Sequence, residues 1–538
     1  MTLWQQYLLM VPILVPLFSA TVLILLSERH HRLKFGLNLV TTLVVLAAAA
    51  MLLWQVDSGT LPLGIGLHFI ADWPAPFGIV LLVDRLSALM VLMASGMAVC
   101  ALLYAESRWS RIGVHFHSLF QFLLMGMNGA FLTHDLFNLF VFFEVMLAAS
   151  YGLVLHGYNS QRLRAGLHYI VINLVASFFF LIGVSLLYAA TGTLNMTDMA
   201  MQIATLSPDD YVLLKVGCGI LVLAFLTKGA AWPLGFWLPQ TYAAASPPVA
   251  AMLVLMTKIG LYAVLRLWLL LFADAPAVLQ GFGGEFLLWS GMATIAFGTF
   301  GMLASQEPAP IAGYGAIISS GILLSVVSFG DADLLAGALF YLIGSTLAIA
   351  AFMLLTEIVN RLRTPASAML ALTMEAFAVE DKPSEPVGVV IPAALAFLGI
   401  AFIGCALMIT GFPPLSGFIA KFSLLRALVE LASSGIANTL IWLLIVLIVV
   451  SGLTGIISLM RFGVRTFWAT NITTSVRLSV SEAVPIVALL LVFIGLTVQA
   501  GQVMGYLERT ADGLLVPQHY QSTVMDNQVA TRASGGDT

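Results

Sequence analysis

Long apolar runs, each about the length that a lipid bilayer requires, follow one another along most of the chain. A helix needs roughly 20 predominantly apolar residues to cross the hydrocarbon core. Applied as a window, this length predicts fourteen membrane-spanning helices. They cover residues 7–27, 35–54, 77–104, 114–132, 136–155, 166–190, 211–231, 247–272, 286–304, 310–329, 334–356, 391–424, 437–460 and 483–502. We therefore expect an all-α polytopic membrane protein.

Two of the apolar segments are too long for one span and contain prolines. They are 211–245, with Pro233 and Pro239, and 391–431, with Pro413 and Pro414. A proline removes a backbone hydrogen bond and bends a helix, and in a bilayer the freed groups must face protein or a wet cavity. Interrupted helices at corresponding places of two halves indicate a transport site.

The interrupted helices are the seventh and the twelfth, five helices apart. Because an odd number of crossings reverses direction, we expect helices 4–8 and 9–13 to form an inverted-topology repeat, as in many transporters. The predicted parts are N-terminal helices 1–3 (residues 1–113), a first five-helix repeat with a proton half-channel (114–272), a second, inverted repeat (286–460), and a cytoplasmic linker, helix 14 and C-terminal tail (461–538).

Basic residues gather on one side of the predicted membrane. They are Arg29, Arg32, Lys34, Arg108, Arg111, Arg162, Arg164, Arg361, Arg363, Arg461, Arg465 and Arg477. The opposite loops 55–76, 192–210, 273–284 and 330–333 hold no Lys or Arg and several Asp. The positive-inside rule therefore predicts a cytoplasmic basic side and two termini outside the cytoplasm. The acidic segment 364–390 is then expected to be a cytoplasmic docking or solvated loop.

Composition narrows the class further. Of 538 residues, 60% are hydrophobic and 9% are charged, whereas soluble domains carry about a quarter charged residues. The net charge of −4 indicates no nucleic-acid partner. Cys100, Cys218 and Cys405 stand alone in apolar segments, which is typical of small core residues. No metal-ligand spacing, phosphate loop or nucleophile motif occurs, so we expect a transporter rather than an enzyme, without metal or cofactor.

Four ionisable residues fall inside predicted spans: Glu144 in "FVFFEVMLAAS", Lys228, Lys258 and Lys421. Such residues are rare in a bilayer and usually face a bundle interior or a wet path. Glu144 follows Asp135 by nine positions, roughly 13.5 Å along a helix, which is too deep for its side chain to reach the interface. Burial favours a neutral lysine and a nearby carboxylate a charged one. These residues therefore indicate proton transfer, with a static ion pair, or snorkelling for Lys421, as the alternative.

Other polar residues have simpler interpretations. His168 could join a proton relay or bond to a neighbour on its own helix. His134 is expected to be interfacial or capping. Asp84 and Arg85 are expected to form a structural salt bridge, and Arg266, near the outer boundary, to reach toward the interface.

Four motifs in this order resemble a known family: "VDRLSALM", "FNLFVFFEVM", "LTKGAAWPLGFWLPQTYAAASPPVAAML" and "GFPPLSGFIAKF". The family is the antiporter-like one, which includes the large membrane subunits of respiratory complex I and the A and D subunits of Mrp-type (Mnh, Pha) multisubunit cation/proton antiporters. The resemblance runs from about residue 70 to 460. The segments "NLFVFFEVMLAASYGLVLHG", "GLHYIVINLVASFFFLIGVSLLYAATGTLNM" and "LFYLIGSTLAIAAFMLLTEI", and the length, resemble the D subunits of these antiporters in particular.

The resemblance implies roles for the buried charges. Glu144 and Lys228 would form a pair, Lys258 would be the connecting residue, and Lys421 the terminal proton-exchange lysine. The chain departs from many relatives because helix 10 and the middle of helix 11 contain no Lys or His. A proton crossing there would need water, held by the hydroxyl side chains of this region. These are Ser319, Ser320, Ser345 and Thr346.

The resemblance also implies the function. We expect a proton-translocating subunit of a bacterial inner-membrane antiporter that exports Na⁺ or K⁺ in exchange for proton entry, working only with other subunits (A, C and smaller ones). The alternative is a proton-pumping membrane subunit of a complex I-like or membrane-hydrogenase redox complex. A stand-alone transporter of an organic substrate is disfavoured, because the helix breaks offer lysines and small residues rather than substrate-shaped polar groups.

Overall fold

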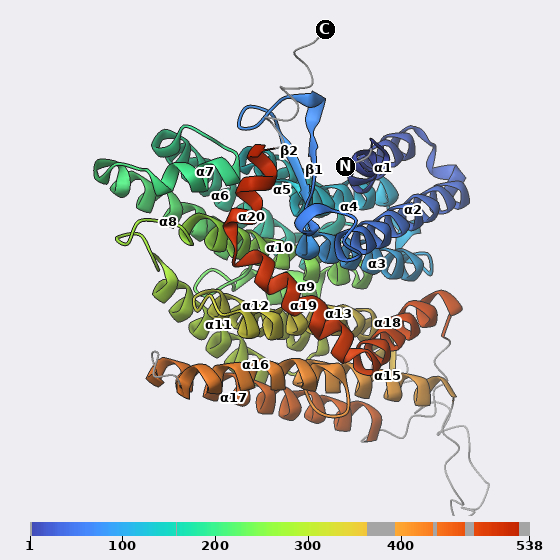
Figure 1. Ribbon diagram of the computed structural model, residues 1–538. Helices are drawn as coiled ribbons and strands as arrows, with labels where there is room; N and C mark the ends of the chain where they lie inside the picture. The colour runs from blue at the N-terminus through green and yellow to red at the C-terminus, as the bar shows by residue number, and fades with distance from the viewer. Residues whose placement is uncertain (1–2, 158, 363–392, 434–437, 469–477, 527–538) are drawn as a thin grey trace, which may run out of the picture.

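A computed structural model describes residues 3–157, 159–362, 393–433, 438–468 and 478–526, and the predicted acidic loop 364–390 lies outside them. Within these ranges, long helices run roughly side by side through the molecule (Figure 1). They are α1 (Leu3–Leu25), α2 (His31–Asp57), α3 (Arg85–Ala105), α4 (Phe116–Leu132), α5 (Leu136–Val154), α6 (Ser160–Thr191), α8 (Tyr211–Lys228), α10 (Pro247–Phe272), α11 (Gly284–Ala304), α12 (Pro308–Val327), α13 (Ala332–Leu362), α15 (Ala393–Thr410), α16 (Ser416–Ser433), α17 (Asn438–Gly463) and α18 (Val480–Val498).

The prediction of a polytopic helical protein is confirmed. Among the described residues, 13 helices are long and apolar enough to cross a membrane. The 17-residue α4, which packs against α1 and α5, accounts for the remaining predicted span. Each of the fourteen predicted windows therefore overlaps a long helix in the described parts of the chain.

The start of the third predicted helix is wrong. Residues 80–83 form strand β2 (Val80–Val83), which pairs antiparallel with β1 (Gly66–Phe69). α3 begins after Asp84, whose carboxylate accepts the N–H of Ser87, while the Ser87 hydroxyl accepts the N–H of Asp84. This reciprocal cap starts the helix. A short apolar run suits a buried strand or a buried helix equally well, which is why the pattern did not separate them.

The two interruptions lie where prolines predicted them, with one correction. α8 ends at Lys228 and a short helix α9 (Trp237–Ala244) follows, with Pro233 in the gap. Pro413 and Pro414 lie between α15 and α16. Pro239, however, is in the first turn of α9. The backbone N–H groups of a first turn have no acceptor within the helix, so a proline there removes no helical hydrogen bond.

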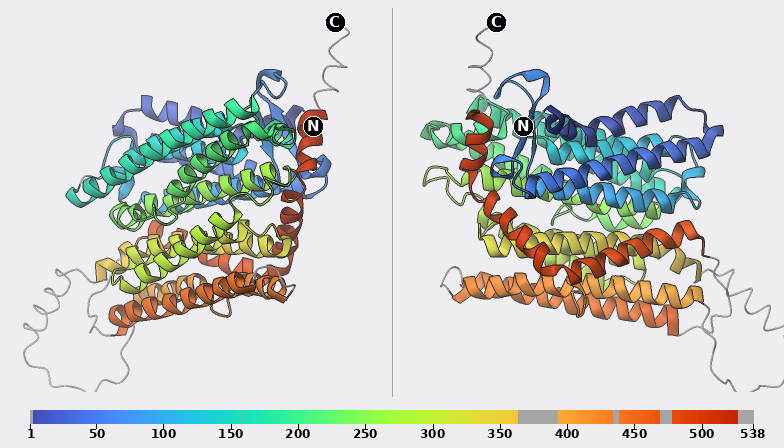
Figure 2. Two further views of the ribbon diagram at one scale, coloured as in Figure 1. Left: turned by 90° about the vertical axis from the view of Figure 1, so that its left-hand side faces the viewer. Right: turned by 45° about the vertical axis from the view of Figure 1, so that its right-hand side comes forward.

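The helices form two halves in which the interrupted helices occupy corresponding places. In the first half α6 packs along α8, and in the second α13 packs against α15 and α16. α10 and α13 meet at the centre, where their apolar windows are completely buried. Five spans separate the equivalent helices, so the second half runs in the opposite direction. Figure 2 shows the two halves as stacked layers.

The C-terminal segment forms an arm rather than a plain tail. Helices α19 (Ala500–Leu514) and α20 (Pro517–Gln521) run across the ends of the long helices, from α18 toward the first half (Figure 2). α19 packs on α13 and buries Leu507, Ala511 and Leu514, which form one apolar stripe at helical spacing. A short amphipathic helix falls below the length that predicts a span, so the apolar windows missed it.

Candidate functional site

Glu144 and Lys228 come together through a third residue, Ser177. Lys228 Nζ donates to Ser177 Oγ at 3.2 Å, and Ser177 Oγ donates to Glu144 Oε1. The described residues contain no direct ion pair between Glu144 and Lys228, so the expected pair is bridged by a hydroxyl. Nothing in the sequence separates Ser177 from Ser185 on the same helix, which only bonds the Leu181 carbonyl.

Local structure explains why Lys228 can be held there. It is the last residue of α8 and is only 4% exposed. The C-terminal end of a helix carries partial negative charge from its free carbonyl groups, which favours a cation. The ring of Phe143, next to Glu144 on α5, lies 5.1 Å from the ammonium and adds a cation–π contact. The helix break therefore creates the lysine site.

Lys258 lies at the centre of the molecule without an acidic partner among the described residues. It is fully buried in the middle of α10. Its ammonium donates to three oxygens of α12: Ser319 Oγ at 2.7 Å, Ser320 Oγ at 3.2 Å and the Ala316 carbonyl at 3.2 Å. All three acceptors are neutral, so the lysine is solvated by dipoles alone.

A polar connection continues from Lys258 toward Lys421. Ser319 Oγ and Ser345 Oγ lie 3.0 Å apart. Ser345 and Lys421 both line a cavity of about 10 Å³, close to the space that a single water molecule needs. Lys421 Nζ donates to the Thr410 carbonyl at 2.8 Å. That carbonyl is free because α15 ends at Thr410, so the second helix break also holds a lysine.

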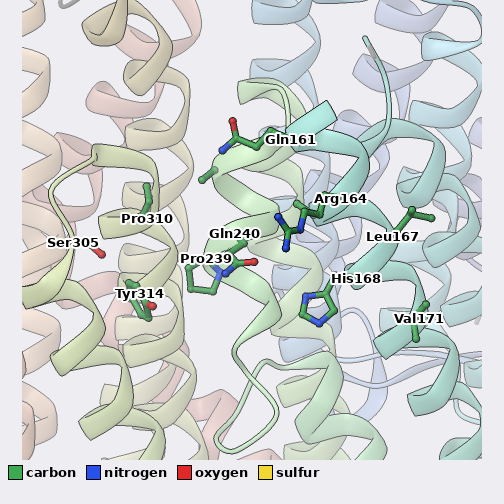
Figure 3. Close-up of a pocket in the computed structure, with 12 residues that line it drawn as sticks. Gln161, Arg164, Leu167, His168, Val171, Pro239, Gln240, Ser305, Pro310 and Tyr314 are labelled. Atoms are coloured by element: carbon green, nitrogen blue, oxygen red, sulfur yellow. The ribbon is translucent and has the colours of Figure 1, made fainter. Parts of the chain in front are cut away.

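Two predicted relay residues lie apart from this connection. Thr346 is buried, but its hydroxyl has no hydrogen-bond partner among the described residues. His168 is exposed on α6, at the edge of a wide pocket that Figure 3 shows. Its closest ring contact is Phe236, with ring centroids 5.6 Å apart. The connection therefore runs through serines of α12 and α13 and not through the histidine.

At the end of the helices where α20 lies, Asp84 has a different partner from the one expected. Arg266 Nη1 and Nη2 donate to its two carboxylate oxygens at 2.6 and 2.9 Å, and the Tyr520 hydroxyl of α20 donates at 2.8 Å. Arg266 is 6% exposed, so its side chain is turned into the protein. Arg85 instead lies 3.6 Å from Asp57. Burial alone would raise the pKa of Asp84, but the Arg266 charge and these hydrogen bonds hold it well below its usual range.

His134 belongs to the same cluster as Asp84 and Arg266. Its Nε2 lies 2.6 Å from the Thr197 hydroxyl, and its ring stacks on Tyr520 with centroids 6.2 Å apart. Burial and the nearby Arg266 charge lower the pKa of His134 to about 3, so the ring is neutral at ordinary pH. The expected helix cap is made by Asp135, whose carboxylate accepts the N–H of Asn138.

The residues of this site lie within a region that matches a known protein family. The family described as "NADH:quinone oxidoreductase/Mrp antiporter, TM" matches residues 133–454. This range contains Glu144, Lys228, Lys258 and Lys421, together with both helix breaks.

Full-length relatives are similar over nearly the whole chain. The D subunit of a probable K(+)/H(+) antiporter of Rhizobium meliloti is 51% identical over 532 residues, which cover 98% of each protein. The D subunit of the Na(+)/H(+) antiporter of Alkalihalophilus pseudofirmus is 33% identical over 526 residues, 96% of this chain and 99% of that one. Among solved structures, a chain of the Mrp complex from a Dietzia species superposes with a TM-score of 0.83 at 25% identity, covering 98% of this chain and all of that one.

Proposed function

The chain belongs to the NADH:quinone oxidoreductase/Mrp antiporter membrane family, and from this premise we propose that it is a D-type subunit of a K⁺/H⁺ or Na⁺/H⁺ antiporter. In this proposal the assembled complex exports the cation in exchange for proton entry. The observation that carries it is two hydrogen-bonded groups of ionisable residues inside the bundle: Glu144 and Lys228 are bridged by Ser177, and Lys258 is linked through Ser319 and Ser345 toward Lys421. Protonatable groups inside a membrane bundle suit proton movement.

In this proposal the ionisable residues form three proton-exchange sites. At the first, the Ser177 hydroxyl can pass a proton between Lys228 and Glu144, because it donates to one and accepts from the other. At the second, Lys258 depends on neutral oxygens, so its charged form is sensitive to the charge of its neighbours. At the third, Lys421 faces a water-sized space shared with Ser345. Loss of the proton at one site changes the Coulomb energy at the next, which couples the sites.

The direction of transport rests on orientation. Most Lys and Arg residues of the connecting loops lie at one end of the helices, and the positive-inside rule assigns that end to the cytoplasm. We place the chain in a bacterial inner membrane with both termini outside the cytoplasm. The D-type assignment also implies hetero-oligomeric partners, namely A, C and smaller subunits.

A pH-gradient assay in inside-out vesicles that contain the whole encoded complex tests the proposal. ATP hydrolysis sets the gradient with respiration blocked, and NaCl or KCl is then added. We expect the salt to collapse the gradient in wild type but not in Glu144→Gln. Glu430→Gln is the matched control, because Glu430 is an exposed carboxylate of α16 that pairs with Arg426.

The outcomes separate the candidate functions. The effective salt identifies the cation. Unchanged exchange in an assembled Glu144→Gln complex would remove Glu144 from the path. No collapse with either salt in wild type, despite verified assembly, would favour a redox-linked proton-pumping protein instead.

A further inference from the structure

A wide pocket of about 950 Å³ opens between α6, α9 and α12 (Figure 3). Glu144, Lys228, Lys258 and Lys421 are not among the residues that line it. Arg164, His168 and Val171 of α6 face it from one side, with Gln240 of α9 between them and Tyr314 of α12. The pocket thus lies on the seam between the first and second halves.

The lining changes from polar to apolar along α6. Gln161, Arg164, His168 and Val171 are spaced by three or four residues and share one face of the helix. Arg164 lies four residues after the start of α6, roughly 6 Å along its axis, and makes no hydrogen bond or ion pair with the described residues. Across the pocket, Arg461 donates to the Ser305 carbonyl at 2.6 Å. The polar end of the pocket therefore carries the charge of Arg164, and a second guanidinium is bonded to the backbone of its opposite wall at Ser305.

The apolar end is continuous with the outer surface of α6. Five side chains form an exposed stripe that starts in the pocket and runs along the helix: Leu167, Val171, Leu174, Val175 and Phe178. In a spanning helix an exposed apolar stripe contacts lipid tails. The pocket is therefore open sideways to the hydrocarbon region, with its basic end at the level where head groups lie.

We propose that this pocket binds one anionic phospholipid, with its phosphodiester on Arg164 and its acyl chains along Leu167 and Val171. A guanidinium matches phosphate oxygens through two parallel hydrogen bonds, and His168, Gln240 and Tyr314 offer further donors in the same space. Basic pockets between membrane helices on the cytoplasmic side suit such head groups. The bound lipid would join the two halves at α9 and α12. This inference requires only that the chain spans a membrane, so it does not depend on the proposed transport.

Native mass spectrometry of the whole purified complex tests the site. Phosphatidylglycerol is the probe, and phosphatidylethanolamine with the same acyl chains is the zwitterionic control. We expect tight phosphatidylglycerol binding that weakens roughly tenfold in Arg164→Gln, the scale of one lost charge-assisted hydrogen bond. Arg164→Lys keeps the positive charge and should retain part of the affinity for phosphatidylglycerol. Arg29→Gln, which removes an exposed arginine from the same basic side, should bind as wild type does.

A second variant tests the space rather than the charge. Ala243 of α9 lines the pocket, so Ala243→Trp should displace the lipid even though Arg164 remains. Equal binding of both lipids, or wild-type binding in both Arg164→Gln and Ala243→Trp, would overturn the proposal. Displacement of the lipid by millimolar inorganic phosphate would overturn it in favour of a free-phosphate site. Crosslinking of a photoreactive residue at position 164 to another protein of the complex, with no lipid adduct, would overturn it in favour of a protein contact.

Discussion

Ser177 offers the sharpest test of the site, because it joins two charged groups and has no charge of its own. Its hydroxyl accepts from Lys228 Nζ and donates to Glu144. Ser177→Ala removes both hydrogen bonds and leaves Lys228 without its side-chain acceptor in the described structure. A hydrogen bond to a charged group contributes about 1.5–3 kcal/mol. If one such bond is needed as the proton passes, the barrier rises by at least about 1.4 kcal/mol, which slows exchange roughly tenfold.

The measurement is the initial rate of gradient collapse after addition of salt, in vesicles with matched amounts of assembled complex. Ser177→Thr keeps the hydroxyl and should retain a larger share of the rate than Ser177→Ala. Ser185→Ala is the matched control, because Ser185 is an exposed serine of α6 whose hydroxyl bonds only within the helix. It should exchange at the wild-type rate.

The reasoning would be refuted by one specific combination. If Ser177→Ala exchanges at the wild-type rate while Glu144→Gln is inactive, the carboxylate is needed but the hydroxyl bridge is not. A proton would then reach Glu144 by another route.

Three further predictions concern other contacts. Ser345→Ala should slow exchange roughly tenfold in the same assay, whereas a wild-type rate would remove Ser345 from the path. Asp84→Asn leaves Arg266 buried without its counter-charge, so stability should fall by about 3–5 kcal/mol; an unchanged thermal unfolding temperature of the complex would contradict this. Because folding lowers the pKa of His134, its contribution to stability is complete above pH about 6.5 and is lost as the pH falls toward 3. His134→Gln should therefore flatten the loss of unfolding temperature between pH 7 and 5, and equal slopes would count against it.

The spans, their interruptions and the buried ionisable residues could be read from the sequence. Membrane insertion depends on the apolar length of each segment, and a proline acts on its own helix, so both are local properties. The same holds for Lys258, whose cost of burial is evident from its apolar neighbours alone and which is fully buried, whereas Glu144, read in the same way, is only half-buried. Pro239 shows the limit of this reading, because its effect depends on whether it lies in a gap or in a first turn.

The hydrogen-bond and ion-pair partners of these residues were decided by the tertiary structure. A serine in an apolar helix becomes a bridge only when that helix is rotated to face both Glu144 and Lys228, as α6 does at Ser177. Asp84 is bonded to Arg266, 182 positions away along the chain, rather than to its neighbour Arg85. The C-terminal arm likewise depends on a surface made by α13, far away in sequence. The sequence determined which segments enter the membrane and which charges they carry; the packing of the helices determined which of those charges meet, because rotation and neighbours are set by contacts among the whole chain.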